Sequence, residues 1–222
     1  MKFIKKLLLT IPIIFNFNAY SAEISNSNRI YIGGGIGNTD MIGTLNHRIV
    51  KLTDKTIKLG NRTTVIKFLI GYGFILEGTP LYFGIESSYQ LGNIELEREI
   101  SAHPNLLISS KINKKDTIGL HAKLGISKKR ILFYIKGGSA YSIFQYTLIN
   151  KSGSLSFMKR LTNKYGISGG IGVSYSLNDH WKSFMEYEIT KYPQIKFNLH
   201  GREEYKFQAS TYTFMTGILY LF

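Results

Sequence analysis

The residues of this chain best suited to ion-handling or acid–base chemistry are lysines and glutamates that stand singly among small or apolar neighbours. The set comprises Lys67, Glu86, Lys123, Lys136, Glu186 and Glu188, and His121 has a similar setting. Buried charges must pair with opposite charges, because an unpaired one carries a large desolvation cost. We therefore expect a structural network of these lysines and glutamates in one interior. Conduction of ions or protons is the alternative use of the same groups.

Residue patterns typical of enzymes are missing. The chain has no cysteine, which excludes thiol nucleophiles, thiolate zinc sites and disulfides. The glycines at 33–37 lack the third glycine of a dinucleotide fingerprint, and no helical pattern follows them. His47, His103 and His200 fall in three separate connections without the short spacing of zinc ligands. We predict no enzyme activity, no cofactor and no metal.

The elements that must position the charged residues are β-strands, because the sequence alternates with a period of two. Within 165–177, bulky residues such as Tyr165 and Ile171 alternate with small ones such as Ser168 and Gly172. The lysines and glutamates above lie on the small, polar face. Eight segments show this split, at 29–37, 63–76, 81–91, 117–126, within 131–149, and at 165–177, 181–192 and 210–222.

This alternation predicts a membrane barrel whose bulky face meets lipid and whose small face lines the lumen. Short connections at 77–80, 127–130 and 178–180 alternate with long ones at 38–62, 92–116, 150–162 and 193–209, as periplasmic turns and extracellular loops would. Strand edges cannot remain unpaired in lipid, so the sheet must close. The predicted fold is all-β: a closed eight-stranded antiparallel up-and-down transmembrane β-barrel, whose lumen side chains fill.

Both ends of the chain carry export signals. Lysines, a short apolar run and a small-residue exit at Ser21 and Ala22 predict a signal peptide over 1–22, removed to leave a barrel domain over 23–222. The apolar run is shorter than the roughly 20 residues that span a bilayer. The last strand resembles the C-terminal signal of outer-membrane barrels at Gly217, Tyr220 and Phe222. It departs from that signal at Met215, which stands where a polar residue is usual. That resemblance implies recognition by the barrel-assembly machinery.

Nearly the whole mature sequence resembles small outer-membrane barrels of the opacity, surface-antigen and OmpA-like type. The resemblance is carried by the sequence 166–175 with Trp181 and Glu186-Tyr187 after it, and by 133–141. It implies a place in the bacterial outer membrane, and a structural role or a role in adhesion and host interaction.

The net charge of +14 is scattered, with many basic residues in the long connections. We expect contact with anionic lipids and lipopolysaccharide rather than nucleic acid. A host-surface or glycan ligand would meet the first long connection, whose candidate contacts are Arg48, Lys51, Lys55, Lys58 and Arg62. Their alternation with apolar residues suggests a β-hairpin that rises above the membrane. We expect a monomer.

Three other functions remain open. The first is a narrow channel, and the second is a barrel hydrolase or acyltransferase that acts on outer-membrane lipid through a lipid-facing Ser/His/Asp cluster. The third is a soluble barrel that binds an apolar ligand, which would require the bulky faces to point inward.

Overall fold

The computed structural model describes residues 29–49, 52–103, 106–150, 156–199 and 203–222. Their backbone forms one antiparallel sheet. Its strands are β1 (Arg29–Ile49), β2 (Leu52–Ile75), β3 (Leu81–Leu91), β4 (Ile94–His103), β5 (Leu106–Lys128), β6 (Ile131–Asn150), β7 (Ser156–Ser176), β8 (Trp181–Lys191), β9 (Ile195–Leu199) and β10 (Glu203–Leu221). No helix in the described ranges is long and apolar enough to cross a bilayer. The predicted signal peptide at 1–22 lies outside the described residues.

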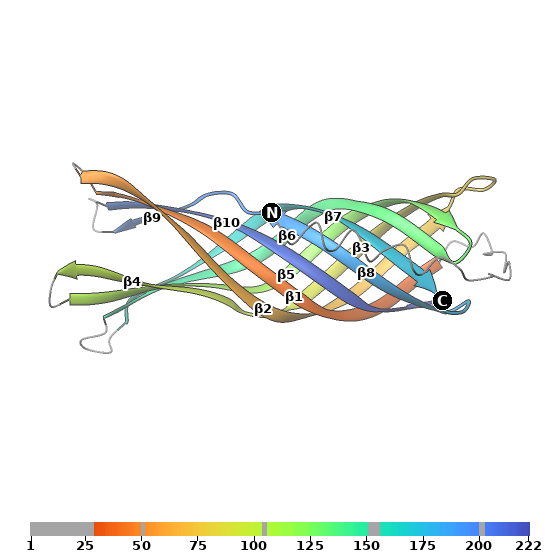
Figure 1. Cartoon of the computed structure of the whole chain (residues 1–222), viewed down its shortest axis with the longest axis horizontal. Helices are drawn as coiled ribbons and strands as arrows, with labels where there is room; N and C mark the ends of the chain where they lie inside the picture. Colours follow the sequence, from red (N-terminus) through yellow and green to blue (C-terminus); the bar gives the residue numbers. More distant parts are fainter. Residues whose placement is uncertain (1–28, 50–51, 104–105, 151–155, 200–202) are drawn as a thin grey trace, which may run out of the picture.

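The sheet closes on itself, because β1 pairs with β10 as well as with β2. The order around the ring is β1-β2-β3-β5-β6-β7-β8-β10, which makes eight strands (Figure 1). The two remaining strands continue ring strands after short interruptions: β4 follows β3 and pairs with β5, and β9 follows β8 and pairs with β10. The predicted closed eight-stranded antiparallel barrel is confirmed.

The outer face of the ring is apolar, as its alternation predicted. Ile85, Leu120 and Ile135 are among the many large hydrophobic side chains that remain exposed. Aromatic rings gather near the short turns, where Trp181 and Phe222 each pack against Tyr220 with ring centroids 5.0 Å apart. A second aromatic group, which includes the Tyr141–Tyr165 pair, lies on the same face farther from those turns. An apolar band between aromatic girdles is typical of membrane barrels.

The long connections are mostly strand rather than loop, which differs from the sequence expectation. The β1–β2 ladder continues through Leu45↔Ile57, and the β5–β6 ladder continues through Ile108↔Asn150. The first connection therefore forms the predicted β-hairpin, and the connections at 92–116, 150–162 and 193–209 also contain paired strands. The position of the hairpin above the membrane stays a prediction. In these connections the apolar residues face inward, whereas in the membrane-spanning strands they face outward. A search for the outward-facing apolar pattern therefore assigns these polar segments to loops.

The barrel divides into two leaves beyond the ring. β2 pairs with β3 only up to Ile66↔Leu91, and β7 pairs with β8 only up to Ile167↔Lys191. Above these points β9, β10, β1 and β2 stay joined in one leaf, and β4, β5, β6 and β7 stay joined in the other. Figure 1 shows the two leaves diverging at the end away from the short turns. We call this part the outer extension.

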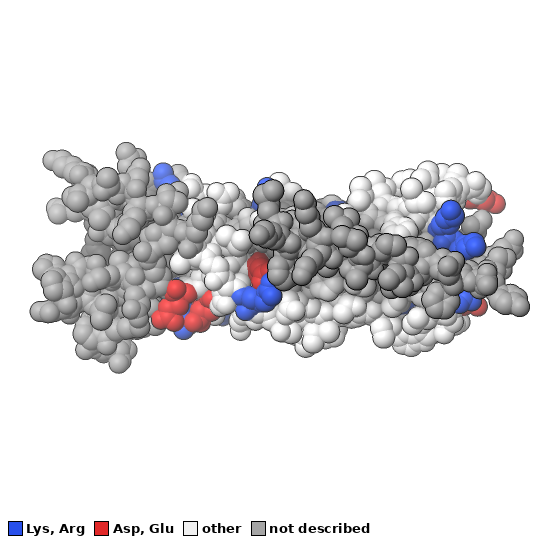
Figure 2. All heavy atoms as spheres, in the orientation of Figure 1, with Lys and Arg blue, Asp and Glu red and all other residues white. Residues whose placement is uncertain are grey.

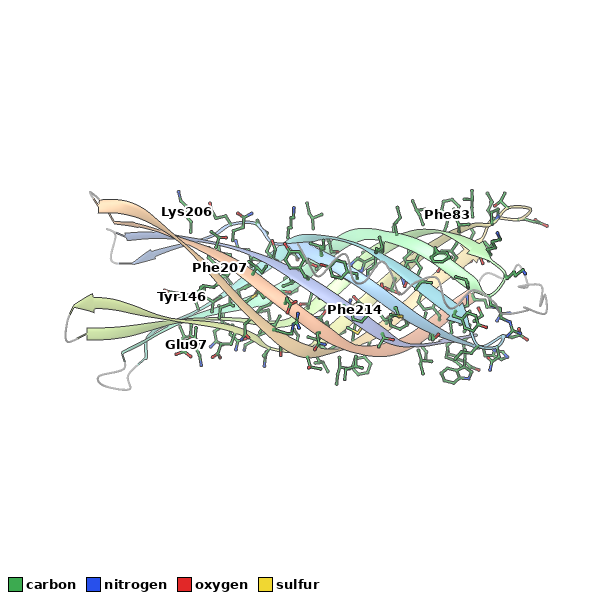
Figure 3. The ribbon with its side chains drawn as sticks, in the orientation of Figure 1. Phe83, Glu97, Tyr146, Lys206, Phe207 and Phe214 are labelled. Carbon is green, nitrogen blue, oxygen red and sulfur yellow. The ribbon has the colours of Figure 1, made fainter. Side chains whose placement is uncertain are left out.

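The outer extension reverses the polarity of the ring by burying apolar side chains between its leaves. Phe207 of the first leaf and Tyr146 of the second belong to this cluster, and both are labelled in Figure 3. The other members are Met41, Ile94, Leu96, Ile112, Phe144, Tyr192, Ile195 and Ala209. A β-bulge between Lys114 and Thr117 exchanges the two faces of β5. The bulge lets Ile112 point inward while Ile118 points outward.

Candidate functional site

The lumen brings the predicted lysines and glutamates together from strands that are distant in sequence. Lys136 Nζ of β6 lies 2.6 Å from Glu186 Oε2 and 2.7 Å from Glu188 Oε2 of β8. Lys67 Nζ of β2 donates to the same Glu188 oxygen at 2.9 Å. Lys123 of β5 pairs with Glu86 of β3, its neighbour in the ring. All six side chains are buried, so they form a compensated set of three cations and three anions.

Aromatic residues complete this network toward the short turns. Tyr31 donates its hydroxyl hydrogen bond to Glu86 Oε2 at 3.0 Å. The ammonium group of Lys123 lies 4.5 Å from the ring centroid of Tyr134, within cation–π range. These contacts satisfy charges that would otherwise be costly at the centre of a membrane barrel.

One lumen contact has the residue types of a hydrolytic triad but not its geometry. His121 Nε2 lies 2.7 Å from Ser168 Oγ, and Glu188 Oε1 lies 3.9 Å from the same nitrogen. A triad carboxylate instead holds Nδ1 and so orients the ring. Among the residues that the structure describes, Nδ1 has no hydrogen-bond partner. All three residues are buried in the lumen rather than facing lipid, so the arrangement does not support the lipid-hydrolase alternative.

Sequence reasoning missed a buried lysine above the network. Lys114 is only 2% exposed, and its Nζ donates to Thr117 Oγ1 at 2.5 Å. Hydrogen bonds continue from Thr117 to Ser142 at 2.7 Å and from Ser142 to Tyr192 at 2.8 Å. No carboxylate among the described residues lies within salt-bridge distance of Lys114. The sequence did not indicate that Lys114 is buried, because the residues 114–116 at the β-bulge have the polar composition of a loop.

Apolar clusters pack inside the barrel next to the charges. The cluster between the leaves lies on the outer side. The second cluster contains Tyr31, Leu219 and Leu221 at the short-turn end, together with Val65, Leu69, Phe184 and Met215. A cavity of about 30 Å³ beside it is lined by residues that include Tyr82, Tyr134, Lys123 and Lys182. That volume holds about one water molecule, so this part of the lumen is filled rather than open.

Two ion pairs lie among the described residues of the outer extension. Arg62 binds Asp40 through two hydrogen bonds, from Nε at 2.5 Å and from Nη2 at 2.8 Å. Lys111 Nζ lies 2.6 Å from Glu95 Oε1, and this hydrogen bond raises the pKa of Lys111 above its usual value. Figure 2 shows charged groups toward the extension and at the short turns, with a mostly uncharged surface between them where it is described.

The other four predicted ligand contacts cannot be placed as side chains. Lys51 lies outside the described residues, and Arg48, Lys55 and Lys58 lie on described backbone of β1 and β2 whose side chains are not described. The β1–β2 pairing places Arg48, Lys55 and Lys58 on one hairpin, with His47 opposite Lys55 and Thr44 opposite Lys58. Arg62 lies lower on the same hairpin and is already bound by Asp40.

The predicted assembly residues lie at the closing seam of the barrel. Gly217 pairs with Gly35, and a Cβ atom at Gly217 would lie 2.2 Å from the Gly34 carbonyl oxygen. Glycine is therefore required by the close approach of β1 and β10. The exposed Phe222 donates its backbone N–H to the Ile30 carbonyl at 3.0 Å. Recognition of this strand by the assembly machinery stays a prediction.

The described residues contain no group of three or more histidine, aspartate, glutamate or cysteine side chains that could hold a metal ion. The side chains of His47, His103 and His200 lie outside what the structure describes.

Solved structures of several outer-membrane barrels have a similar fold. The outer membrane protein OprG from Pseudomonas aeruginosa is 14% identical, with a TM-score of 0.61 over 89% of this chain and 97% of that one. The outer membrane protease OmpT from Escherichia coli is 9% identical, with a TM-score of 0.50 over 89% and 98%. Ail from Yersinia pestis, in complex with the heparin analogue sucrose octasulfate, is 13% identical, with a TM-score of 0.41 over 88% and 99%.

At such identities the likenesses to OprG and OmpT concern the fold alone. No curated protein sequence matches the chain. The family model described as the outer membrane protein beta-barrel domain, however, matches residues 13–216. With its closed ring, lipid-facing apolar surface and internally paired charges, the chain belongs to the family of outer membrane protein β-barrel domains.

Proposed function

We propose that this protein is a non-catalytic surface protein whose barrel anchors an outer extension that binds anionic saccharides. The proposal rests on one observation: the lumen is filled, and an extension of paired strands lies above it. Paired charges occupy the ring, and an apolar cluster packs between the leaves above it. A barrel built in this way favours a role on its outer surface over transport through its interior.

The proposed contact surface is the end of the β1–β2 hairpin, where Arg48, Lys51, Lys55 and Lys58 are close in sequence. Clustered basic residues attract anionic ligands, and the attraction weakens as salt screens it. Arg62 contributes less to this surface, because Asp40 already neutralises it. Sulfated or carboxylated host glycans and the phosphates of lipopolysaccharide share the chemistry that these cations recognise.

The test is charge reversal of the hairpin by K51E, K55E and K58E together. Reversal at K128E, K129E and R130E, in the turn between β5 and β6, is the matched control. Refolded proteins are compared for binding to immobilised heparin and, separately, to purified lipopolysaccharide. We expect the hairpin variant to lose at least about tenfold in affinity for one or both, and the control to change little. Equal binding by the parent protein, the hairpin variant and the control variant would overturn the proposal.

Planar-bilayer recording addresses the channel alternative. The filled lumen predicts no discrete conductance steps from the folded protein. Regular steps from protein that also shows the heat-dependent gel shift of a folded barrel would replace the proposed function with that of a channel.

A further inference from the structure

The edge strand β7 of the outer extension has no main-chain partner on the side away from β6 among the described residues. β7 stays paired with β6 up to Ile149↔Ser156, but its pairing with β8 ends at Ile167↔Lys191. The chain then reaches Pro193, which has no N–H to donate to a ladder. β9 resumes after this interruption and pairs only with β10, in the other leaf. Among the described strands, none pairs with the side of 156–166 that faces away from β6.

The opposite seam between the leaves is bridged. The side chain of Asn61 in β2 donates to the Glu95 carbonyl of β4 at 2.7 Å. Glu95 also pairs with Lys111 of β5, its neighbour within the same leaf. No main-chain pairing joins β7 to β9 within the part of the chain that the structure describes. The two seams thus differ: a side-chain hydrogen bond crosses the seam between β2 and β4, and no main-chain pairing among the described residues crosses the seam beside β7.

The free edge has a uniform charge and an apolar base. Residues 156–166 include Lys159, Arg160 and Lys164, and neither this segment nor 191–199 contains an aspartate or glutamate. At the base, Ile167 is 79% exposed and Tyr165 is 71% exposed, more than any other large hydrophobic side chain in the described ranges. Exposed strand edges are templates for pairing with another chain.

We propose that the free edge of β7 binds an extended acidic segment of a partner protein, which adds a strand to the second leaf. Unpaired backbone groups supply the ladder hydrogen bonds of such β-augmentation, and alternating side chains supply its specificity. An acidic strand complements the lysines and arginine of β7. Pairing of β7 with the β7 of a second copy would instead oppose like charges across the ladder. A saccharide has no peptide backbone with which to form that ladder.

This site is independent of the proposed saccharide site. β7 belongs to the leaf formed with β4, β5 and β6, whereas the β1–β2 hairpin belongs to the other leaf. Either site can therefore fail without the other. The variant K51E/K55E/K58E should retain peptide binding, and a variant of β7 should retain saccharide binding.

The test uses the full chain refolded in detergent micelles and a fluorescein-labelled peptide that alternates glutamate with valine. Fluorescence anisotropy compares it with the same peptide N-methylated at every residue, which keeps its charge but has no backbone donors. Hydrogen–deuterium exchange of residues 156–166 reports whether binding protects the β7 edge. The charge variant K159E/R160E/K164E is compared with K128E/K129E/R130E, and the heat-dependent gel shift verifies that each has folded.

We expect the unmodified peptide to bind and to slow exchange in 156–166, and the N-methylated peptide to bind at least about tenfold more weakly. Reversing the three β7 charges should weaken binding by about tenfold or more, and the turn variant should not. Equal affinity of the two peptides would reveal a contact based on charge alone and overturn the proposal. So would an absence of binding, or displacement by heparin with no protection of β7.

Discussion

Replacing Lys136 with methionine should destabilise the barrel by orphaning one particular carboxylate. Lys136 is the ammonium group shared by Glu186, at 2.6 Å, and Glu188, at 2.7 Å. Glu188 keeps a second partner in Lys67 at 2.9 Å. Glu186 has no other ion pair in the described part of the chain. In K136M, Glu186 therefore becomes a buried charge without a counterion, whereas Glu188 remains compensated.

The size of the effect follows from this difference. Removing one member of a buried ion pair typically costs about 3–5 kcal/mol, mostly because the partner is left charged and desolvated. We expect K136M to lose stability in this range. Adding Glu186→Gln removes the orphaned charge, so K136M/E186Q should recover most of the loss. K136M/E188Q should recover less, because it leaves Glu186 orphaned and also removes the partner of Lys67.

Reversible urea unfolding in lipid vesicles measures these free energies, with the fluorescence of Trp181 as the signal because it is the single tryptophan. The exposed Lys128→Met is the control and should change stability by no more than about 0.5 kcal/mol. A loss below about 1 kcal/mol in K136M would refute the buried-pair reasoning. Stronger rescue by E188Q than by E186Q would refute the assignment of Glu186 as the orphaned group.

Three further predictions test other parts of the structure. Lys114→Met should leave urea stability within about 1 kcal/mol of the parent or raise it, since it removes a buried cation without breaking an ion pair. Gly217→Val should abolish the heat-dependent gel shift by separating β1 from β10, while Gly137→Ala, with no atom within 4 Å of its new Cβ, should fold. The Glu95 hydrogen bond raises the pKa of Lys111 above 10.5, so its stabilisation is complete below pH 10.5 and is lost as pH rises through the raised pKa. NMR titration of Lys111 should show this raised pKa, and Glu95→Gln should lower it.

The candidate site was only partly predictable. Lys67, Glu86, Lys123, Lys136, Glu186 and Glu188 could be placed on the lumen face, because strand alternation assigns each residue to one of two faces. Lys114 could not, because the bulge that follows it shifts this alternation by one residue. The extent of the strands also escaped prediction. An apolar inner face such as that of Ile94 and Leu96 is recognisable only when an opposing leaf is present to bury it.

The sequence by itself determined the barrel class, the lipid-facing surface and the lumen-facing charges, because these follow from the local two-residue period and from side-chain size. The tertiary structure decided which charges pair, since Lys67 of β2 and Glu188 of β8 meet only across a closed ring. It also decided that the extension separates into two leaves and that one edge of β7 stays free. Those outcomes depend on register between strands far apart in the chain, and local alternation carries no information about that register.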